Sequence, residues 1–304
     1  MRNQGYLFSS EESSQVINRF GADFFAHVNG GLAAFCKRWQ LDELALIPSF
    51  SANLVFTCTS GIFGDAVLKI GRPDSVYIQT EFQALSAYGG RPFCNVFDID
   101  AAGGALLEER LLPGTPLRKL DTLEERVDRF SSLYNGLHMP PLEGIVFPTY
   151  TRWVERITDY MKGRPDCREL YGQMEKACEL YRGLTEKYNR SMLLHGDFHH
   201  DNILLSSDGS YVIIDPKGVI GDPLFDVPRF MLNEFEDELT AELAAKIERM
   251  IVLLETQLAI PAPILRACLY IETVMGMCWS VEDGAGPDEY VKLLETAAFA
   301  EALL

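Results

Sequence analysis

The hydrophobic pattern of the chain changes at Pro113-Gly114, and this change is the strongest constraint on its fold. Before it, short strand-like runs alternate with helical stretches; after it, nearly every segment has the spacing of an amphipathic helix. A chain of 304 residues is long enough for one or two domains. We therefore expect an α+β fold of two lobes, a small β-rich N-terminal lobe over residues 1–110 and a larger helical lobe over residues 111–304.

The individual segments support this division. The first part contains the strand-like runs LVFTCT, AVLKI, FCNVFDI and ALLEERLL, and helical spacing over residues 13–26 and 76–88. The second part has helical spacing over residues 121–138, 149–162, 167–190, 236–259, 262–281 and 288–303. Residues 192–215 interrupt the helices, with LLHG, NILL and YVIID as short strands and SSDGS as a hairpin turn.

Composition excludes several classes of function. Acidic residues outnumber basic ones 44 to 27, for a net charge of −17, so we expect neither a nucleic-acid partner nor a membrane surface. The seven cysteines include no C-x-x-C pair, which argues against a zinc site and a disulfide framework. The N-terminus has no apolar signal region, and no apolar run approaches about 18 residues. We expect a cytoplasmic protein.

The segment from residue 193 to 230 carries the chemistry. It places Asp197 after the strand-like LLHG, Asn202 at the start of NILL, and Asp215 at the end of YVIID. In an antiparallel hairpin, Asn202 and Asp215 come from neighbouring strand ends and can converge. A carboxylate and an amide oxygen suit Mg²⁺, which takes its remaining ligands from water and phosphates.

These residues resemble the catalytic core of the kinases. The string HGDFHHDN keeps the Asp-to-Asn interval of the protein-kinase motif H-R-D-L-x-x-x-N, and IIDP stands where D-F-G would be. The Gly after the His departs from the protein-kinase motif, and with it the segment resembles the aminoglycoside phosphotransferase family. The longer string HGDFHHDNILL…IIDPKGVIGDPLFDVPRF resembles its streptomycin 6-phosphotransferase and hydroxyurea kinase subgroup. The resemblance implies a protein-kinase-like fold.

The resemblance extends upstream to the expected nucleotide-binding residues. It implies that Lys69 in AVLKI pairs with nucleotide phosphates and that Glu81 in the following helix is its ion-pair partner. ALLEERLLPGTPL resembles the connector, where backbone groups from Glu109 to Leu111 would meet the adenine edge. The segment SFSANLVF stands where the glycine-rich phosphate loop G-x-G-x-x-G would be. Ser51 and Asn53 would therefore have to contact the phosphates in its place.

The resemblance also implies roles for the residues of the segment. Asp197 would align the acceptor hydroxyl as the catalytic residue, and Asn202 and Asp215 would hold Mg²⁺ against the phosphates of ATP. His199 would contact the γ-phosphate. The function implied is an ATP-dependent transfer to a hydroxyl of a cationic or polyhydroxy small molecule, an aminoglycoside-like acceptor of the streptomycin type.

Other interpretations stay open at this point. The acceptor could be another small hydroxyl or amino-alcohol metabolite, or hydroxyurea. His195, His199 and His200 could form a metal cluster with Asp197, as in a hydrolase, although adjacent side chains on an extended segment point to opposite faces. The chain could also bind a nucleotide without turning it over. We expect Asp226 to be a structural cap rather than a substrate contact.

Overall fold

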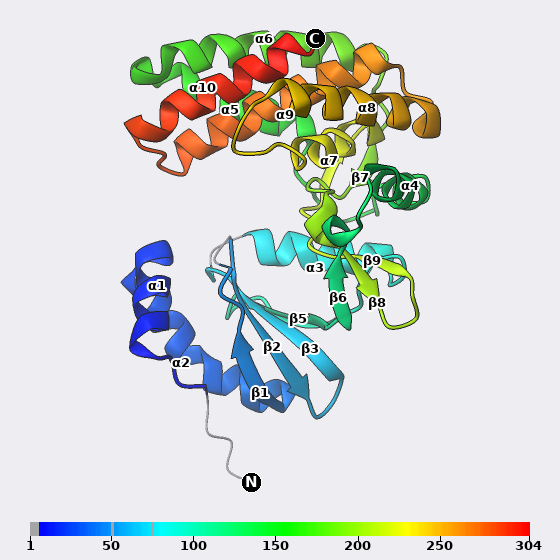
Figure 1. Cartoon of the computed structure of the whole chain (residues 1–304). Coiled ribbons are helices and arrows are strands. Elements are labelled where there is room, and N and C mark those ends of the chain that lie inside the picture. The colour runs from blue at the N-terminus through cyan, green and yellow to red at the C-terminus, as the bar shows by residue number, and fades with distance from the viewer. Residues whose placement is uncertain (1–5, 50–51, 74–75) are drawn as a thin grey trace. The chain divides into compact units, whose positions relative to one another are not determined.

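The computed structural model describes residues 6–49, 52–73 and 76–304 (Figure 1). The chain forms two compact units, which we describe separately. The first comprises Met1–Thr115 and Leu205–Ile214, and the second comprises Pro116–Leu204 and Asp215–Leu304. The second unit is therefore interrupted in sequence by the ten residues around the SSDGS turn, which belong to the first unit.

The first unit is built on a five-stranded antiparallel sheet with the strand order β1-β2-β3-β5-β4 (Figure 1). Its strands are β1 (Leu41–Leu46), β2 (Leu54–Ser60), β3 (Gly64–Ile70), β4 (Val96–Asp100) and β5 (Ala105–Glu109). Its helices are α1 (Ser10–Phe20), α2 (Ala22–Trp39) and α3 (Val76–Tyr88). A further three-stranded sheet has the order β6-β8-β9, formed by β6 (Pro113–Pro116), β8 (Ile203–Ser206) and β9 (Tyr211–Ile213).

One core joins the α2 helix to the five-stranded sheet. Side chains of α2 at helical spacing, from Phe24 and Val28 to Trp39, are buried together with alternate residues of β2 such as Phe56. This alternation puts every second β2 side chain into the core. The helix expected over residues 13–26 is in fact two helices, because Gly21 has a positive φ of 93°, which few other residues adopt.

The second unit is mainly helical. Its longer helices are α4 (Leu123–Tyr134), α5 (Tyr150–Lys162), α6 (Arg168–Thr185), α8 (Ala241–Leu258), α9 (Ala262–Glu282) and α10 (Pro287–Ala302), and α7 (Pro228–Leu232) is short. These helices confirm the helical segments expected after Pro113. The short strands β7 (Met192–Leu194) and β10 (Val219–Gly221) pair antiparallel, and the segment that carries the chemistry runs between them.

Helix α9 is the central helix of this unit. Twelve of its residues are buried, and it packs against α5, α6, α7, α8 and α10. Among the described residues, α9 is the one helix long and apolar enough to cross a membrane, but 61% of its most apolar window is buried inside the protein. A core helix passes the same test of length and composition. Glu272 is the charged residue among the buried residues of α9.

Candidate active site

In the first unit, Lys69 is buried between two carboxylates. Its Nζ lies 2.5 Å from Glu81 Oε1 and 2.9 Å from Glu108 Oε1, and the three residues are 4%, 6% and 2% exposed. Glu81 faces inward because it follows the buried Ile78 by three residues on α3. The structure thus brings together Lys69 and Glu81, as the sequence suggested, and adds a second carboxylate.

Glu108 was missed by the sequence analysis. In the register of β3 and β5, Lys69 lies opposite Leu106, and Glu108 points to the same face two residues further along. The available signal was the glutamate pair Glu108-Glu109, which directly follows the apolar residues of the same strand. The face toward which it points depends on the pairing with β3, which the sequence alone does not supply.

The other residues expected to bind the nucleotide also lie in the first unit. The Asn53 side-chain oxygen lies against Gly71 at the end of β3, so close that a methyl group on Gly71 would be 2.7 Å from it. The Glu109 carboxylate accepts two hydrogen bonds from Arg91, and the Glu109 N–H donates to the Asn95 carbonyl. Leu111 is buried, and Ser51 lies outside the described residues.

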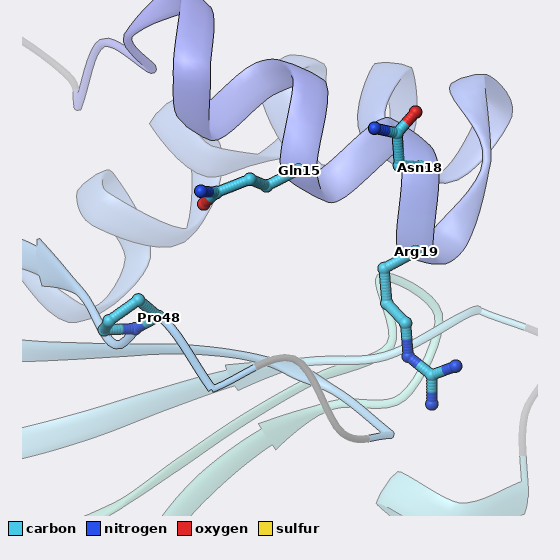
Figure 2. Close-up of a pocket in the computed structure, with 4 residues that line it drawn as sticks. All are labelled: Gln15, Asn18, Arg19 and Pro48. Carbon is cyan, nitrogen blue, oxygen red and sulfur yellow. The ribbon is translucent and has the colours of Figure 1, made fainter.

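Figure 2 shows a hollow in the first unit that is separate from these residues. It is lined by Gln15, Asn18 and Arg19 of α1 and by Pro48. None of the predicted site residues lines it. The hollow therefore carries no part of the expected chemistry.

In the second unit, the segment after β7 is held in place by Asp226. The Asp226 carboxylate accepts hydrogen bonds from the backbone N–H groups of His195 (2.8 Å) and Gly196 (2.7 Å), and it lies 3.0 Å from His138 Nε2. Gly196 has a φ of 79°, and a side chain there would meet Val219 at 2.9 Å. Asp226 and Gly196 together fix the direction in which the chain enters Asp197.

Three cationic or donor groups surround the Asp197 carboxylate. Arg229 Nε donates to Oδ1 at 2.8 Å, His199 Nε2 lies 3.5 Å from the same oxygen, and Lys217 Nζ lies 3.7 Å from Oδ2. Burial raises the pKa of Asp197, but the His199 hydrogen bond and the Arg229 and Lys217 charges outweigh it and hold the pKa well below its usual value. Asp197 therefore stays ionised at neutral pH.

Asn202 contacts the backbone of Asp197, and Asp215 shares the Lys217 ammonium with the Asp197 carboxylate. The Asn202 amide nitrogen donates to the Asp197 carbonyl at 2.9 Å and lies 3.3 Å from His199 Nε2. Asp215 Oδ2 lies 3.8 Å from Lys217 Nζ, so one ammonium lies within 4 Å of both Asp197 and Asp215. Asp215 also has a φ of 64°, an unusual value for a non-glycine residue that is common at functional sites.

This donor set fits a hard divalent cation that is partly held by phosphates. Asp215 offers a carboxylate, and Asn202 uses its nitrogen for the hydrogen bonds above, which leaves its amide oxygen for a cation. An ammonium beside two carboxylates marks a place where positive charge is favourable. Within the described ranges, no group of three His, Cys, Asp or Glu residues forms a complete protein cage for a metal. Mg²⁺ typically binds through one or two carboxylates plus substrate phosphates.

The three histidines of the segment have separate partners. His195 is buried, and its Nδ1 accepts from the Asp197 N–H at 3.1 Å. The His200 ring stacks on Phe230 at 4.0 Å and faces Asn233 and Glu234, 3.1 and 2.9 Å away. His195 thus contacts the backbone of Asp197, whereas His199 lies beside its carboxylate. The structure therefore does not assemble the metal cluster of the hydrolase interpretation.

Residues 38–284 match the aminoglycoside/hydroxyurea antibiotic resistance kinase family. The chain belongs to this family. The predicted family resemblance is confirmed, and so is the enzyme class, a small-molecule phosphotransferase acting on a hydroxyl group.

Two curated relatives illustrate the range of this kinase family. A streptomycin 6-kinase from Streptomyces griseus is 26% identical over 282 residues, 90% of each chain. A hydroxyurea phosphotransferase from Kitasatospora aureofaciens is 27% identical over 285 residues, 90% of this chain and 80% of that one. The two relatives act on chemically different compounds, as their names state.

Solved structures confirm the fold. A thermostable mutant of aminoglycoside phosphotransferase APH(4)-Ia, in a ternary complex with ADP and hygromycin B, has a TM-score of 0.65 at 16% identity, covering 89% of this chain and 96% of its own. The choline kinase LicA from Streptococcus pneumoniae has a TM-score of 0.64 at 15% identity, covering 89% and 96%. The α+β, protein-kinase-like architecture expected from the sequence is therefore correct.

Proposed function

We propose that this kinase transfers the γ-phosphate of ATP to a hydroxyl group of an aminoglycoside-like acceptor of the streptomycin type. The observation that carries the proposal is the arrangement around Asp197, where Asn202 and Asp215 accompany a carboxylate that stays ionised. Phosphoryl transfer requires mainly positioning and charge stabilisation, which such a group of oxygens and cations supplies.

Residues 1–110 are proposed to bind the nucleotide. Lys69, fixed by Glu81, anchors the α- and β-phosphates, while Ser51 and Asn53 cover them in place of a glycine-rich loop. Backbone groups of Glu109 and Leu111 meet the adenine. The Glu109 N–H already donates to Asn95, so an adenine contact at that residue falls to its carbonyl oxygen.

Residues 111–304 are proposed to carry the metal ligands and the acceptor. Asn202 and Asp215 hold Mg²⁺, which neutralises charge developing on the phosphates when bound. His199 lies beside both Asp197 and Asn202, and we assign it a contact to the γ-phosphate. Because the cytoplasm supplies ATP, we propose that the reaction takes place there.

Asp197 is proposed to align the acceptor hydroxyl. Because its pKa is held well below the usual value, it is a weak base and a permanently ionised hydrogen-bond acceptor. That suffices if the transition state is loose, since the hydroxyl then loses its proton late. The role of Asp197 is to orient the attacking oxygen for in-line transfer.

The choice of acceptor is supported by the relatives and by charge. Streptomycin 6-kinase is among the similar proteins, and a net charge of −17 favours a cationic acceptor over an anionic one. The similarity to hydroxyurea phosphotransferase makes hydroxyurea the second candidate.

A panel assay of ADP release separates these candidates. The protein is incubated with Mg-ATP and, in turn, streptomycin, hygromycin B, choline and hydroxyurea, with the Asp197→Ala variant as control. We expect acceptor-dependent ADP release with streptomycin and its loss in the variant. Release with hydroxyurea alone would select the second candidate, and full activity of Asp197→Ala would overturn the assigned role.

A further inference from the structure

Arg229 is shared between Asp197 and a second, deeply buried carboxylate. Its Nε donates to Asp197 Oδ1 at 2.8 Å, and its Nη1 lies 3.4 Å from Glu272 Oε1. Glu272 also accepts a hydrogen bond from the Tyr150 hydroxyl at 2.7 Å. The four side chains form one continuous chain of contacts, Tyr150–Glu272–Arg229–Asp197, through the second unit.

The elements that carry this network are fixed independently of it. Arg229 lies on α7, which begins two residues after Asp226, the residue that anchors the backbone before Asp197. Helix α7 packs on α9, the central helix that carries Glu272. Arg229 is therefore held at both ends, by its helix and by Glu272, before any substrate arrives.

Burying the Glu272 carboxylate costs free energy unless a partner compensates its charge. Burial raises the pKa of Glu272, while the Arg229 charge and the Tyr150 hydrogen bond oppose this rise. A glutamate is rarely placed inside an apolar helix face without a partner. The partner of Glu272 is the Arg229 guanidinium, which also donates a hydrogen bond to Asp197.

We propose that Arg229 is a positioning residue for the phosphoryl transfer, with Glu272 and Tyr150 as its support. By occupying Oδ1 of Asp197, Arg229 fixes the carboxylate rotation and leaves Oδ2 to accept the acceptor hydroxyl. The planar guanidinium directs its Nε and Nη1 donors in fixed directions toward the two carboxylates, whereas the ammonium of a lysine, on its flexible stem, does not fix their orientation. This inference rests on the proposed function, because it assigns Arg229 a role through Asp197.

The test compares kinetic constants of Arg229→Gln, Arg229→Lys and the double variant Arg229→Gln/Glu272→Gln. The acceptor is the panel compound that is turned over fastest, streptomycin by our proposal. The matched control is Arg156→Gln, which removes another arginine–glutamate pair to α9, with Glu282. We expect Arg229→Gln to lower kcat by about 100-fold, which is the effect of misplacing a reacting group by about 1 Å. The KM for ATP should stay within about twofold of the wild-type value. Arg156→Gln should leave kcat within about twofold.

Two further comparisons distinguish positioning from folding. The double variant removes both charges of the Arg229–Glu272 pair. Its unfolding midpoint should therefore be higher than that of Arg229→Gln, while its kcat stays low. The residual activity of the Asp197→Ala variant is measured by transfer of label from the γ-phosphate of ATP. Adding Arg229→Gln to this variant should not lower the residual rate further. Arg229→Lys keeps the charge and should retain about tenfold more kcat than Arg229→Gln.

Three outcomes would overturn the inference: an unchanged kcat in Arg229→Gln, a large rise in the KM for ATP, or a full additional loss in the Asp197→Ala background. A kcat that recovers together with stability in the double variant would show a purely structural role and overturn it as well. Failure of the proposed function has a different signature, since Asp197→Ala itself would then remain active.

Discussion

Replacing Lys69 with methionine should destabilise the first unit far more than loss of a surface ion pair does. Lys69 Nζ lies 2.5 Å from Glu81 and 2.9 Å from Glu108, and none of the three residues is more than 6% exposed. Lys69→Met would leave two buried carboxylates side by side without the ammonium that lies within 3 Å of both. Removing one partner of a buried ion pair typically costs about 3–5 kcal/mol, a large share of the stability of a domain.

Urea unfolding at pH 7 measures this loss. With an m-value of about 2 kcal/mol/M, the expected shift of the midpoint is about 1.5–2.5 M. The control Arg38→Met removes an exposed arginine that pairs with Asp98 in the same unit, and should cost about 1 kcal/mol or less. The triple variant Lys69→Met/Glu81→Gln/Glu108→Gln should recover at least about half of the loss, because it also removes the two buried carboxylate charges. A Lys69→Met protein as stable as Arg38→Met, or a triple variant no more stable than Lys69→Met, would contradict this prediction.

Three further predictions concern the second unit. Gly196→Ala should lower kcat by about 100-fold and the unfolding free energy by about 2 kcal/mol, because a methyl group there would meet Val219 at 2.9 Å at a φ of 79°. Kinetics and urea unfolding of this variant check both numbers. Asn202→Ala should raise the Mg²⁺ concentration for half-maximal turnover by about tenfold, which a Mg²⁺ titration of ADP release measures; an unchanged value would remove Asn202 from the metal site. Glu234→Gln should cost about 3 kcal/mol at pH 7, because the His200 and Lys246 hydrogen bonds outweigh burial and hold the Glu234 pKa below its usual value. A lowered pKa stabilises the fold above the unfolded-state pKa and loses that effect as the pH falls, so the difference from wild type should shrink toward pH 3; a pH-independent difference in urea unfolding would contradict this cause.

Local sequence patterns predicted the parts of the structure that depend on neighbours in sequence. The helical spacing after Pro113 gave the major helices, and the turn SSDGS lies between β8 and β9. The Lys69–Glu81 pair was anticipated from the resemblance to kinases, and its two residues lie only 12 apart in sequence. Short separations leave few alternative geometries.

The missed residues act over long separations. Arg229 and Glu272 are 43 residues apart, and their contact exists because α7 packs on α9. Helix packing of this kind depends on the whole core, which no local pattern encodes. A glutamate in the middle of the mostly apolar stretch ACLYIETVM was a visible sign at Glu272, but the sequence did not show its partner. Likewise, Glu108 becomes a partner of Lys69 only through the register of β3 and β5.

The most direct test of the account is transfer of label from ATP that is radiolabelled on its γ-phosphate, with streptomycin as the acceptor. Wild-type protein and Asp197→Ala are compared at equal nucleotide occupancy, measured separately by nucleotide binding. The account predicts labelled streptomycin with the wild type and almost none with the variant, although both bind ATP. Equal labelling by the two proteins would contradict the assignment of Asp197 and, with it, the proposed mechanism.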